Sequence, residues 1–479
     1  MPVFGRVNKY ISGGYTFMKR KIVAVVLAST MVFGMTACGS SGASDSSSTG
    51  SDAATDDTAT DDGSEDANVT EGSSDDENTL TVWTWDPNFN IYAINKAAEI
   101  YAKDHPGFKV DVSEIKSDDI ETRLTTAVSA GDLSTLPDIF LMQDNSFQKY
   151  ATNYPDIFTD LTDSGIDFSQ FSEAKVAYST LDGKNYGIPF DNGAVIECLR
   201  TDMLEKAGYT IDDFTDITWS DFMEKAKVVK EKTGQPILTS QAGSPDLIME
   251  MLQSCGESLF NEDGSVNIKD NKALKPILEI YKQMVEDGTL VEVTDWDQYI
   301  ASINNSTVAG VINGCWIMAS IVANDDQSGQ WAITNMPKLD DVEGATNYSN
   351  NGGSSWAITT NCQKTDLAID FMNSTFAGST ELYDDIIAKG ALATWAPAGD
   401  SEVYAQPVEF FSNEAVYAKI VDFATKTPSN VTGAFYYDAR DAVGVALSNI
   451  IQSGADMDSE IANAPVSYTH LTLPTKRIV

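Results

Sequence analysis

The sequence predicts an α/β fold of two lobes, each a mainly parallel sheet flanked by helices, and three observations support this. Residues 79–142 alternate strand-like and helix-like patterns in the order of a βαβαβ unit, which implies a parallel sheet. Helical and extended segments keep alternating after residue 142, without an internal repeat. The chain has 479 residues, 42% of them hydrophobic, which is enough for two lobes with cores.

The first five elements follow from side-chain periodicity. Apolar residues at every second position predict a strand, and apolar residues spaced by three or four predict one face of a helix. His105-Pro106-Gly107 ends the first helix and Gly131 ends the second. In chain order the segments are a strand over 79–85, a helix over 91–101, a strand over 108–112, a helix over 120–128 and a short buried strand over 137–142.

The later elements are predicted in the same way. A turn at Asp182-Gly183 is followed by an extended segment to Phe190. Helices are expected at 201–207, 219–233, 247–255, 273–287 and 366–375, and strands at 308–312, 331–336 and 355–359. Residues 456–464 start a final helix, which Pro465 should break. Residues 465–479 resemble translated adaptor sequence, and we expect that they are not native and that the final helix is cut short.

The N-terminal segment is predicted to direct export. Residues 1–17 precede the expected true start at Met18, and a basic Met-Lys-Arg-Lys run is followed by an apolar stretch over 22–37. Met35-Thr36-Ala37-Cys38-Gly39 resembles a lipobox, with Met where Leu is usual, so residues 18–38 are expected to be a lipoprotein signal with Cys38 lipidated. The alternative is an ordinary cleavage site with an incidental cysteine.

Residues 39–78 have the composition of a disordered tether. They carry twelve Asp and Glu residues, no Lys or Arg and few apolar residues, so they cannot bury enough surface to fold. The whole chain has a formal charge of -40, which repels phosphate and argues against nucleic-acid binding. No later stretch is apolar enough to span a bilayer.

The cysteines and histidines give no cofactor or metal signal. Besides Cys38, four cysteines lie far apart in apolar settings, where buried free thiols are expected, although three disulfide pairings stay possible. The four are Cys198, Cys255, Cys315 and Cys362. No pair has zinc spacing and the chain has two histidines, so no metal site is expected.

Polar and aromatic residues follow two strands of the predicted first sheet. Trp85, Asp86 and Asn88 come at the end of the first strand, and Asp144 follows the third. In open α/β sheets ligands bind outside the carboxyl ends of the strands, so these turns should converge on one binding edge. Trp83 is expected in the core, and Trp219 and Trp331 are assigned to packing.

The order of several motifs resembles a known family. The motifs are Asp182-Gly183-Lys184, Tyr186-Gly187-Ile188-Pro189, Arg200-Thr201-Asp202, Lys206-Ala207-Gly208, Thr218-Trp219, and the segments 308–316, 351–372 and 433–443. Their succession over residues 79–464 resembles the extracellular solute-binding proteins of bacterial ABC sugar importers, the class of maltose-binding protein.

The resemblance implies two lobes joined by crossing hinge strands, which close over a sugar and then dock on a membrane permease. It also implies a first lobe of 79–189 plus 356–405 and a second lobe of 190–355 plus 406–464. The expected protein is a monomer, lipid-anchored on the extracytoplasmic face of the membrane, that binds a sugar or oligosaccharide without any cofactor.

Sugar recognition needs flat rings against C–H faces, and carboxylates or amides against hydroxyl groups. For each ring, core packing is the alternative, and one of the last two tyrosines should face the cleft while the other packs. The candidate ligand-binding residues are Trp85, Asp86, Asn88, Asp144, Asp191, Asn313, Trp316, Asn351, Trp356, Trp395, Tyr436 and Tyr437.

Two other functions stay open at this point. A secreted glycoside hydrolase also has an aromatic cleft, with two carboxylates that need not be close in sequence. However, the chain has no nucleophile elbow, metal motif or phosphate loop, so an enzyme is not expected. A surface lipoprotein that senses sugar would share the same cleft, and the sequence does not separate it from a transport protein.

Overall fold

A computed structural model of the chain describes residues 69–261, 264–428, 430–433 and 435–472. All of them belong to one compact unit of the chain, residues 63–479. Three predicted segments lie outside the described residues. They are residues 1–17 before the expected start, the signal segment 18–38 with Cys38, and residues 39–68 of the tether. Within the described part of the chain, no helix combines the length and the hydropathy needed to cross a bilayer.

The first half of the fold is the predicted βαβαβ unit. β1 (Thr79–Thr84) lies between β2 (Lys109–Glu114) and β3 (Ile139–Gln143), and both pairs are parallel. The connections are α1 (Asn90–Tyr101), which ends before Pro106, and α2 (Ser117–Ala130), which ends at the left-handed Gly131. The five predicted elements are therefore confirmed, and we call the half built on β1–β3 the first lobe.

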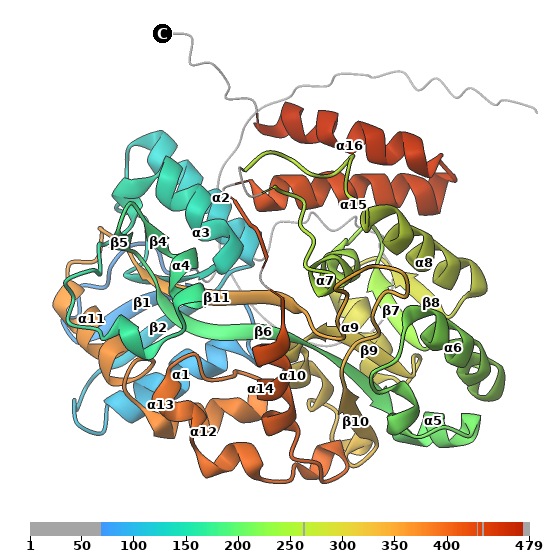
Figure 1. Ribbon diagram of the computed structural model, residues 1–479. Helices are drawn as coiled ribbons and strands as arrows, with labels where there is room; N and C mark the ends of the chain where they lie inside the picture. The colour runs from blue at the N-terminus through green and yellow to red at the C-terminus, as the bar shows by residue number, and fades with distance from the viewer. Residues whose placement is uncertain (1–68, 262–263, 429, 434, 473–479) are drawn as a thin grey trace, which may run out of the picture. The chain divides into compact units, whose positions relative to one another are not determined.

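Two strands connect the halves. β6 (Ile188–Arg200) pairs with β11 (Asn350–Ile358) over its first residues, and then with β9 (Gly310–Gly314) and β10 (Trp331–Thr334). The sheet order is β10-β6-β11-β3-β1-β2, with β9 also paired to β6. Figure 1 shows β6 and β11 running from one half into the other.

The second half, which we call the second lobe, departs from the expected parallel arrangement around β6. β9 and β10 both pair antiparallel with β6. A parallel pair does occur beside them, formed by β7 (Leu238–Gln241) and β8 (Leu290–Val293). The lobe thus has a mixed sheet arrangement, because the strand that enters it from the first lobe runs against its neighbours.

Helices pack on both halves, and most of the predicted ones lie within one residue of their expected bounds. The remaining elements are α3 (Asp144–Asn153), α4 (Glu173–Tyr178), β4 (Thr180–Leu181), β5 (Lys184–Asn185), α5 (Thr201–Ala207), α6 (Trp219–Thr233), α7 (Asp246–Ser254), α8 (Leu274–Asp287), α9 (Trp296–Asn304), α10 (Met318–Ile321), α11 (Thr365–Ser374), α12 (Thr380–Ile386), α13 (Ala396–Gly399), α14 (Val416–Lys426), α15 (Tyr436–Ser453) and α16 (Met457–Thr472).

The buried side chains form separate cores in the two halves. Leu80, Ile139 and Trp356 belong to a first-lobe core, whereas Trp219, Leu278 and Leu447 belong to a second-lobe core. Trp83 is fully buried, as predicted, and Trp219 and Trp331, which the sequence assigns to core or surface packing, are fully buried as well. The residue bounds of the lobes stay a prediction, since Ile387 and Leu392 from the segment assigned to the first lobe pack in a core with Ile196 of β6 and Val311 of β9.

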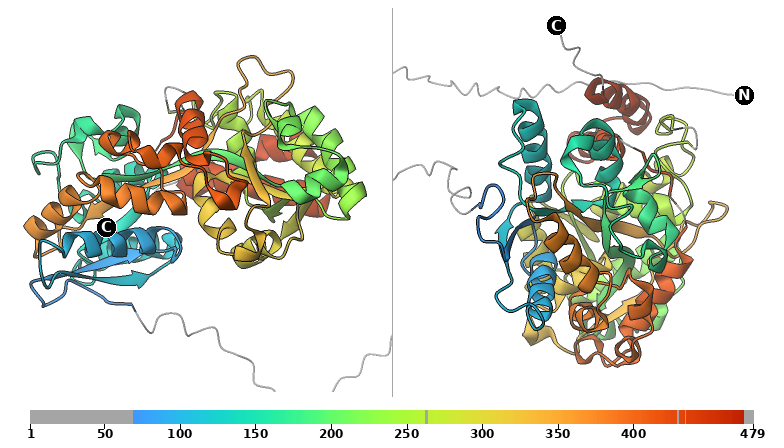
Figure 2. Two further views of the ribbon diagram at one scale, coloured as in Figure 1. Left: turned by 90° about the horizontal axis from the view of Figure 1, so that it is seen from below. Right: turned by 90° about the vertical axis from the view of Figure 1, so that its left-hand side faces the viewer.

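The final helix does not stop where Pro465 predicts. α16 runs from Met457 to Thr472 with Pro465 inside it, and it packs beside α15 (Figures 1 and 2). Ile461 and Ala464 bury their side chains against the second-lobe core, so packing extends to the residue before the proline. The expectation of a break at Pro465 is wrong, while the non-native origin of residues 465–479 stays a prediction.

The predicted tether also ends earlier than expected. Residues 69–78 lie against the first lobe: the Thr70 N–H donates to Ser113 Oγ at 2.9 Å, and Trp83 Nε1 donates to the Thr70 carbonyl at 3.1 Å. Tether composition therefore does not mean disorder over 69–78, because these residues are held by backbone groups, which composition does not reveal. We call this segment the strap.

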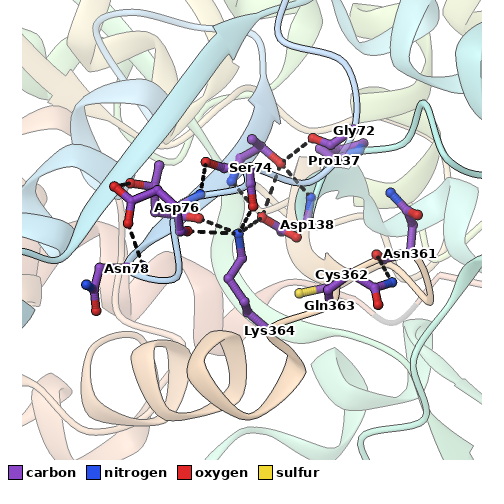
Figure 3. A network of polar contacts seen from close by, with 12 residues as sticks. Gly72, Ser74, Asp76, Asn78, Pro137, Asp138, Asn361, Cys362, Gln363 and Lys364 are labelled. Carbon is purple, nitrogen blue, oxygen red and sulfur yellow. Dashed lines mark hydrogen bonds and ion pairs between the residues drawn. The ribbon is translucent and has the colours of Figure 1, made fainter.

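One lysine holds the end of the strap (Figure 3). Lys364 Nζ donates to the carbonyls of Ser74 at 2.8 Å and Thr79 at 2.7 Å, and lies 3.5 Å from Asp138 Oδ2. Asp138 is fully buried and accepts the Thr81 N–H at 2.9 Å. The start of β1 is therefore fixed to α11 and β3 by charge-assisted hydrogen bonds.

Candidate functional site

A cleft of about 1200 Å³ lies between the lobes. The carboxyl ends of β1 and β3 face it from the first lobe, and α9 and the start of α15 face it from the second, while β6 and β11 border it where they cross. Aromatic rings from both lobes line it. They are Trp85, Phe89, Tyr150, Tyr178, Trp296, Trp316, Tyr436 and Tyr437.

The turn after β1 holds Trp85 at the cleft. Asn90, at the start of α1, accepts the N–H groups of Trp85 at 3.2 Å and Asp86 at 2.9 Å on its Oδ1 atom. Asp86 in turn accepts the Asn88 N–H at 2.8 Å. Trp83 points into the core, whereas Trp85 stays half-buried and lines the cleft. Burial raises the pKa of Asp86 above its ordinary value.

A pair of indoles, Trp296 and Trp316, forms one wall of the cleft. Trp296, at the start of α9, has its ring centroid 5.9 Å from that of Trp316 and stacks on Tyr299 at 5.1 Å. Trp316 Nε1 donates to the Asn351 carbonyl at 2.9 Å, so β11 fixes the orientation of its ring. A fixed, half-exposed indole is suited to covering an apolar ligand face.

A buried carboxyl group holds the Asn351 side chain. Asn351 Nδ2 donates to Glu250 Oε1 at 2.8 Å and to Asn313 Oδ1 at 3.0 Å. Asn313 then donates to the Tyr299 hydroxyl at 3.0 Å. Burial, and secondarily the Asp246 charge, raises the pKa of Glu250 to about 8. Glu250 is therefore largely protonated at neutral pH, as expected for an acid removed from water.

We expect the Glu250 proton to shape the pH dependence of stability. The folded state keeps this proton up to a pKa of about 8, against 4.5 ordinarily, so stability should fall as pH rises through that window. In urea unfolding between pH 5 and 9, Glu250→Gln, which retains an acceptor for Asn351, should remove up to roughly 1 kcal/mol per pH unit of this fall. If the wild type and Glu250→Gln lost stability in parallel as pH rises, the Glu250 proton would not be the cause of the fall.

Three buried charges lie where the lobes join. Lys175 on α4 pairs with Asp144 and donates to the Ser354 carbonyl at 3.0 Å. Asp191 on β6 accepts the N–H of Ser354 at 2.9 Å. Burial raises the pKa of Asp191 to about 6, although Lys175 opposes the shift. At this point the pairing of β11 with β6 has a register shift. Gly353 has a φ of +107°, a backbone conformation that residues other than glycine rarely adopt.

Two contacts cross the cleft from α15. The Tyr437 hydroxyl donates to Gln143 Oε1 at the end of β3. Lys149 on α3 pairs with Asp438 at 3.2 Å. Both α15 residues lie within the first turn of that helix, so this turn contacts the first lobe directly. Tyr436 and Tyr437 both line the cleft, and Tyr436 also packs against the second-lobe core, so the expectation that one ring faces the ligand and the other packs stays a prediction.

Four of the candidate residues do not line the cleft. Trp356 is fully buried against Phe190 and Phe376, with ring centroids 5.5 Å away in each case, because its position on β11 faces the first-lobe core. Trp395 packs on the same core. Asp144 is buried in its pair with Lys175, and Asn313 lies behind the wall, where it orients Asn351 and Tyr299.

The structure does bring the other candidates together. They are Trp85, Asp86, Asn88, Asp191, Trp316, Asn351, Tyr436 and Tyr437. Sequence reasoning missed Gln143, Trp296, Glu121 and Arg440, which also line the cleft. Trp296 has a signal that could have found it: it follows β8, a strand of a parallel pair, and so obeys the same rule as Trp85.

Two lobes joined by crossing strands around an aromatic and polar cleft define a binding protein of the hinged, two-lobed class. The chain belongs to the bacterial extracellular solute-binding protein family, whose model matches residues 96–411. The resemblance stated from the sequence is thereby confirmed.

Among relatives, the lactose-binding protein of Rhizobium radiobacter is 39% identical over 365 residues, which are 76% of this chain and 86% of that protein. The arabinooligosaccharide-binding protein of Bacillus subtilis (strain 168) is 23% identical over 304 residues, 62% of this chain and 68% of that protein.

Solved structures share the fold. An ABC transporter associated binding protein from B. animalis subsp. lactis, in complex with beta-1,6-galactobiose, has a TM-score of 0.71 at 20% identity, covering 82% of this chain and 97% of that one. The galacto-N-biose-/lacto-N-biose I-binding protein from Bifidobacterium longum, in complex with lacto-N-biose, has a TM-score of 0.68 at 17% identity, covering 82% and 96%.

Proposed function

We propose that the chain is the sugar-binding component of an ABC importer, and that it binds a neutral di- or oligosaccharide in the cleft between its lobes. The observation that carries the proposal is the gathering of rings from both lobes around one cleft with carboxylate and amide groups. The 39% identity to a lactose-binding protein supports a sugar, and makes a galactoside the first ligand to test.

Trp85, Trp296 and Trp316 line the cleft and are suited to cover the C–H faces of a sugar. Asp86, Asn88, Asp191, Asn351 and the hydroxyls of Tyr436 and Tyr437 are assigned to its hydroxyl groups. A volume of about 1200 Å³ exceeds the roughly 300–1,000 Å³ of most small-ligand sites, which favours more than one sugar ring.

The charges of the cleft favour an uncharged ligand. Acidic side chains outnumber basic ones among the lining residues: Asp86, Glu114, Asp118, Glu121, Asp191, Asp246, Asp297, Asp438 and Asp441, against Lys116, Lys149 and Arg440. Asp438 and Asp246 occupy Lys149 and Arg440 in ion pairs. An anionic sugar would meet net repulsion, because acidic side chains outnumber basic ones around the cleft.

Delivery requires attachment and a membrane partner. We assign Cys38, the last residue of the signal segment 18–38, as the lipid-bearing residue that anchors the protein on the extracytoplasmic face. We also propose that the protein is a monomer that docks on the permease. Two acyl chains suffice for stable anchoring. Growth with a signal peptidase inhibitor should shift the mass of the cellular protein, and an unchanged mass would remove the anchor.

We propose that the protein binds the sugar without catalysing a reaction, rather than hydrolysing a glycosidic bond. Sugar should favour the closed form, because that form contacts it from both lobes. A thermal-shift panel of lactose, melibiose, maltose and arabinobiose tests this: a ligand at 100 times its Kd stabilises by about 2.7 kcal/mol. Each sugar is then recovered and analysed. No shift with any sugar would overturn the proposal, and cleaved products would turn it into a hydrolase.

A further inference from the structure

A second, much smaller pocket lies behind the indole wall of the cleft. Its volume is about 20 Å³, and its lining includes the residues of β7 and Trp296, which follows β8. A space of this size accommodates one water-sized group. Asp246 and Trp296 line both this pocket and the large cleft, so the two spaces adjoin at these residues.

The small pocket contains an unpartnered polar group. Thr239, on β7, is 6% exposed, and its Oγ1 atom has no hydrogen-bond partner among the described residues. Leaving a buried hydroxyl unpaired is unfavourable, so such groups normally meet a partner. Thr239 Oγ1 both donates and accepts, and it therefore suits another hydroxyl group or water.

The other walls also present hydrogen-bonding groups. α7 begins at Asp246 without a side-chain cap, and Asp246 and Leu247 of its first turn line the pocket. The first N–H groups of a helix lack partners within the helix and attract an oxygen atom. The Asn313 side chain lines the pocket as well. An oxygen placed here can thus accept from backbone N–H groups and donate to Thr239 Oγ1, whereas Asn313 Oδ1 already accepts from Asn351 and Gly314.

We propose that this pocket is a subsite for a single hydroxyl group of the bound sugar, which replaces a water held there in the free protein. The inference rests on the proposed function, and it deepens it by assigning one hydroxyl. The hydroxyl of a hydroxymethyl arm suits it best, because that arm projects beyond the ring and can pass beside Trp296 while the ring stays in the cleft.

A crystal structure of the sugar-free protein gives the first test. One water should lie within hydrogen-bonding distance of Thr239 Oγ1, and in the sugar-bound crystal a sugar hydroxyl should replace it. A dry pocket in the free protein would overturn the inference. A water that stays in place when sugar is bound would also overturn it, since the pocket would then hold a structural water only.

Calorimetry with matched ligands gives the second test. Lactose, 6-deoxylactose and 6′-deoxylactose are titrated into the wild type, Thr239→Val and a control variant, Thr289→Val. The control removes another buried hydroxyl, that of Thr289 just before β8, which donates to the Met284 carbonyl. The wild type and the control should prefer lactose to one deoxy form by roughly tenfold, and Thr239→Val should lose that preference.

The outcomes separate the two proposals. A wild type that binds lactose but discriminates against neither deoxy form overturns the hydroxyl subsite alone, and so does a Thr239→Val variant that keeps the wild-type preference. A wild type that binds no sugar of the panel overturns the proposed function itself. Unfolding curves for both variants check that neither substitution acts through a general loss of the fold.

Discussion

Replacing Lys175 with methionine should lower the free energy of unfolding by about 3–5 kcal/mol. The Lys175 and Asp144 side chains are each 4% exposed, and Asp191 is equally buried beside them. Without the ammonium group, two carboxylates remain in a site with little water, and burying an unpaired charge is costly. Urea unfolding at neutral pH measures the loss.

The pH dependence of the Lys175→Met defect tests its cause. The pKa of Asp191 is already raised to about 6 in the presence of Lys175. Without the lysine both carboxylates should stay protonated to a higher pH, so the defect should be largest near pH 8 and should shrink below pH 6. Lys184→Met is the control, because its 3.0 Å pair with Asp160 is solvent-exposed and should contribute at most about 1 kcal/mol. Equal losses would contradict the argument.

Replacing Trp85 with alanine should weaken sugar binding by about 1–3 kcal/mol through lost stacking and lost apolar contact. The loss of stability should be smaller than the loss of sugar affinity, because the Trp85 side chain is half-buried at the cleft. Trp83, in contrast, carries the packing within the sheet. Calorimetry with the tightest sugar of the panel measures the effect.

Trp395→Ala provides the matched control for Trp85. Trp395 is also half-buried and packs on the first-lobe core, but it does not line the cleft. Its loss should reduce stability and leave the affinity near that of the wild type. A reversal, with sugar affinity lost in Trp395→Ala and retained in folded Trp85→Ala, would contradict the placement of the binding surface.

Local periodicity accounts for most of what the sequence predicts correctly. α5 and α6 begin and end where the apolar spacing and their closing glycines, Gly208 and Gly234, indicate. The first sheet follows from its βαβαβ order, and the rule that ligands lie at the carboxyl ends of strands placed Trp85 and Asp86 correctly.

The errors arise where a side chain's direction depends on distant partners. Trp356 and Asn351 lie on opposite faces of the same strand, Trp356 toward the core and Asn351 toward the cleft, and strand alternation alone does not tell which face is which. Asp144 is a candidate from the sequence because it follows a strand, and nothing near it in the sequence indicates its partner Lys175, which lies 31 residues further along the chain. The strap escaped prediction since hydrogen bonds from Lys364 to main-chain carbonyls leave no compositional trace.

The Lys364 bonds have a mechanical consequence. A pulling force that reaches the folded chain from its N-terminal side enters at the strap and is resisted by Lys364 and the start of β1. The strap contacts named above all belong to the first lobe, so the tension would end there. If the chain were pulled from its N-terminal side, the second lobe would carry no load and could still rotate relative to the first.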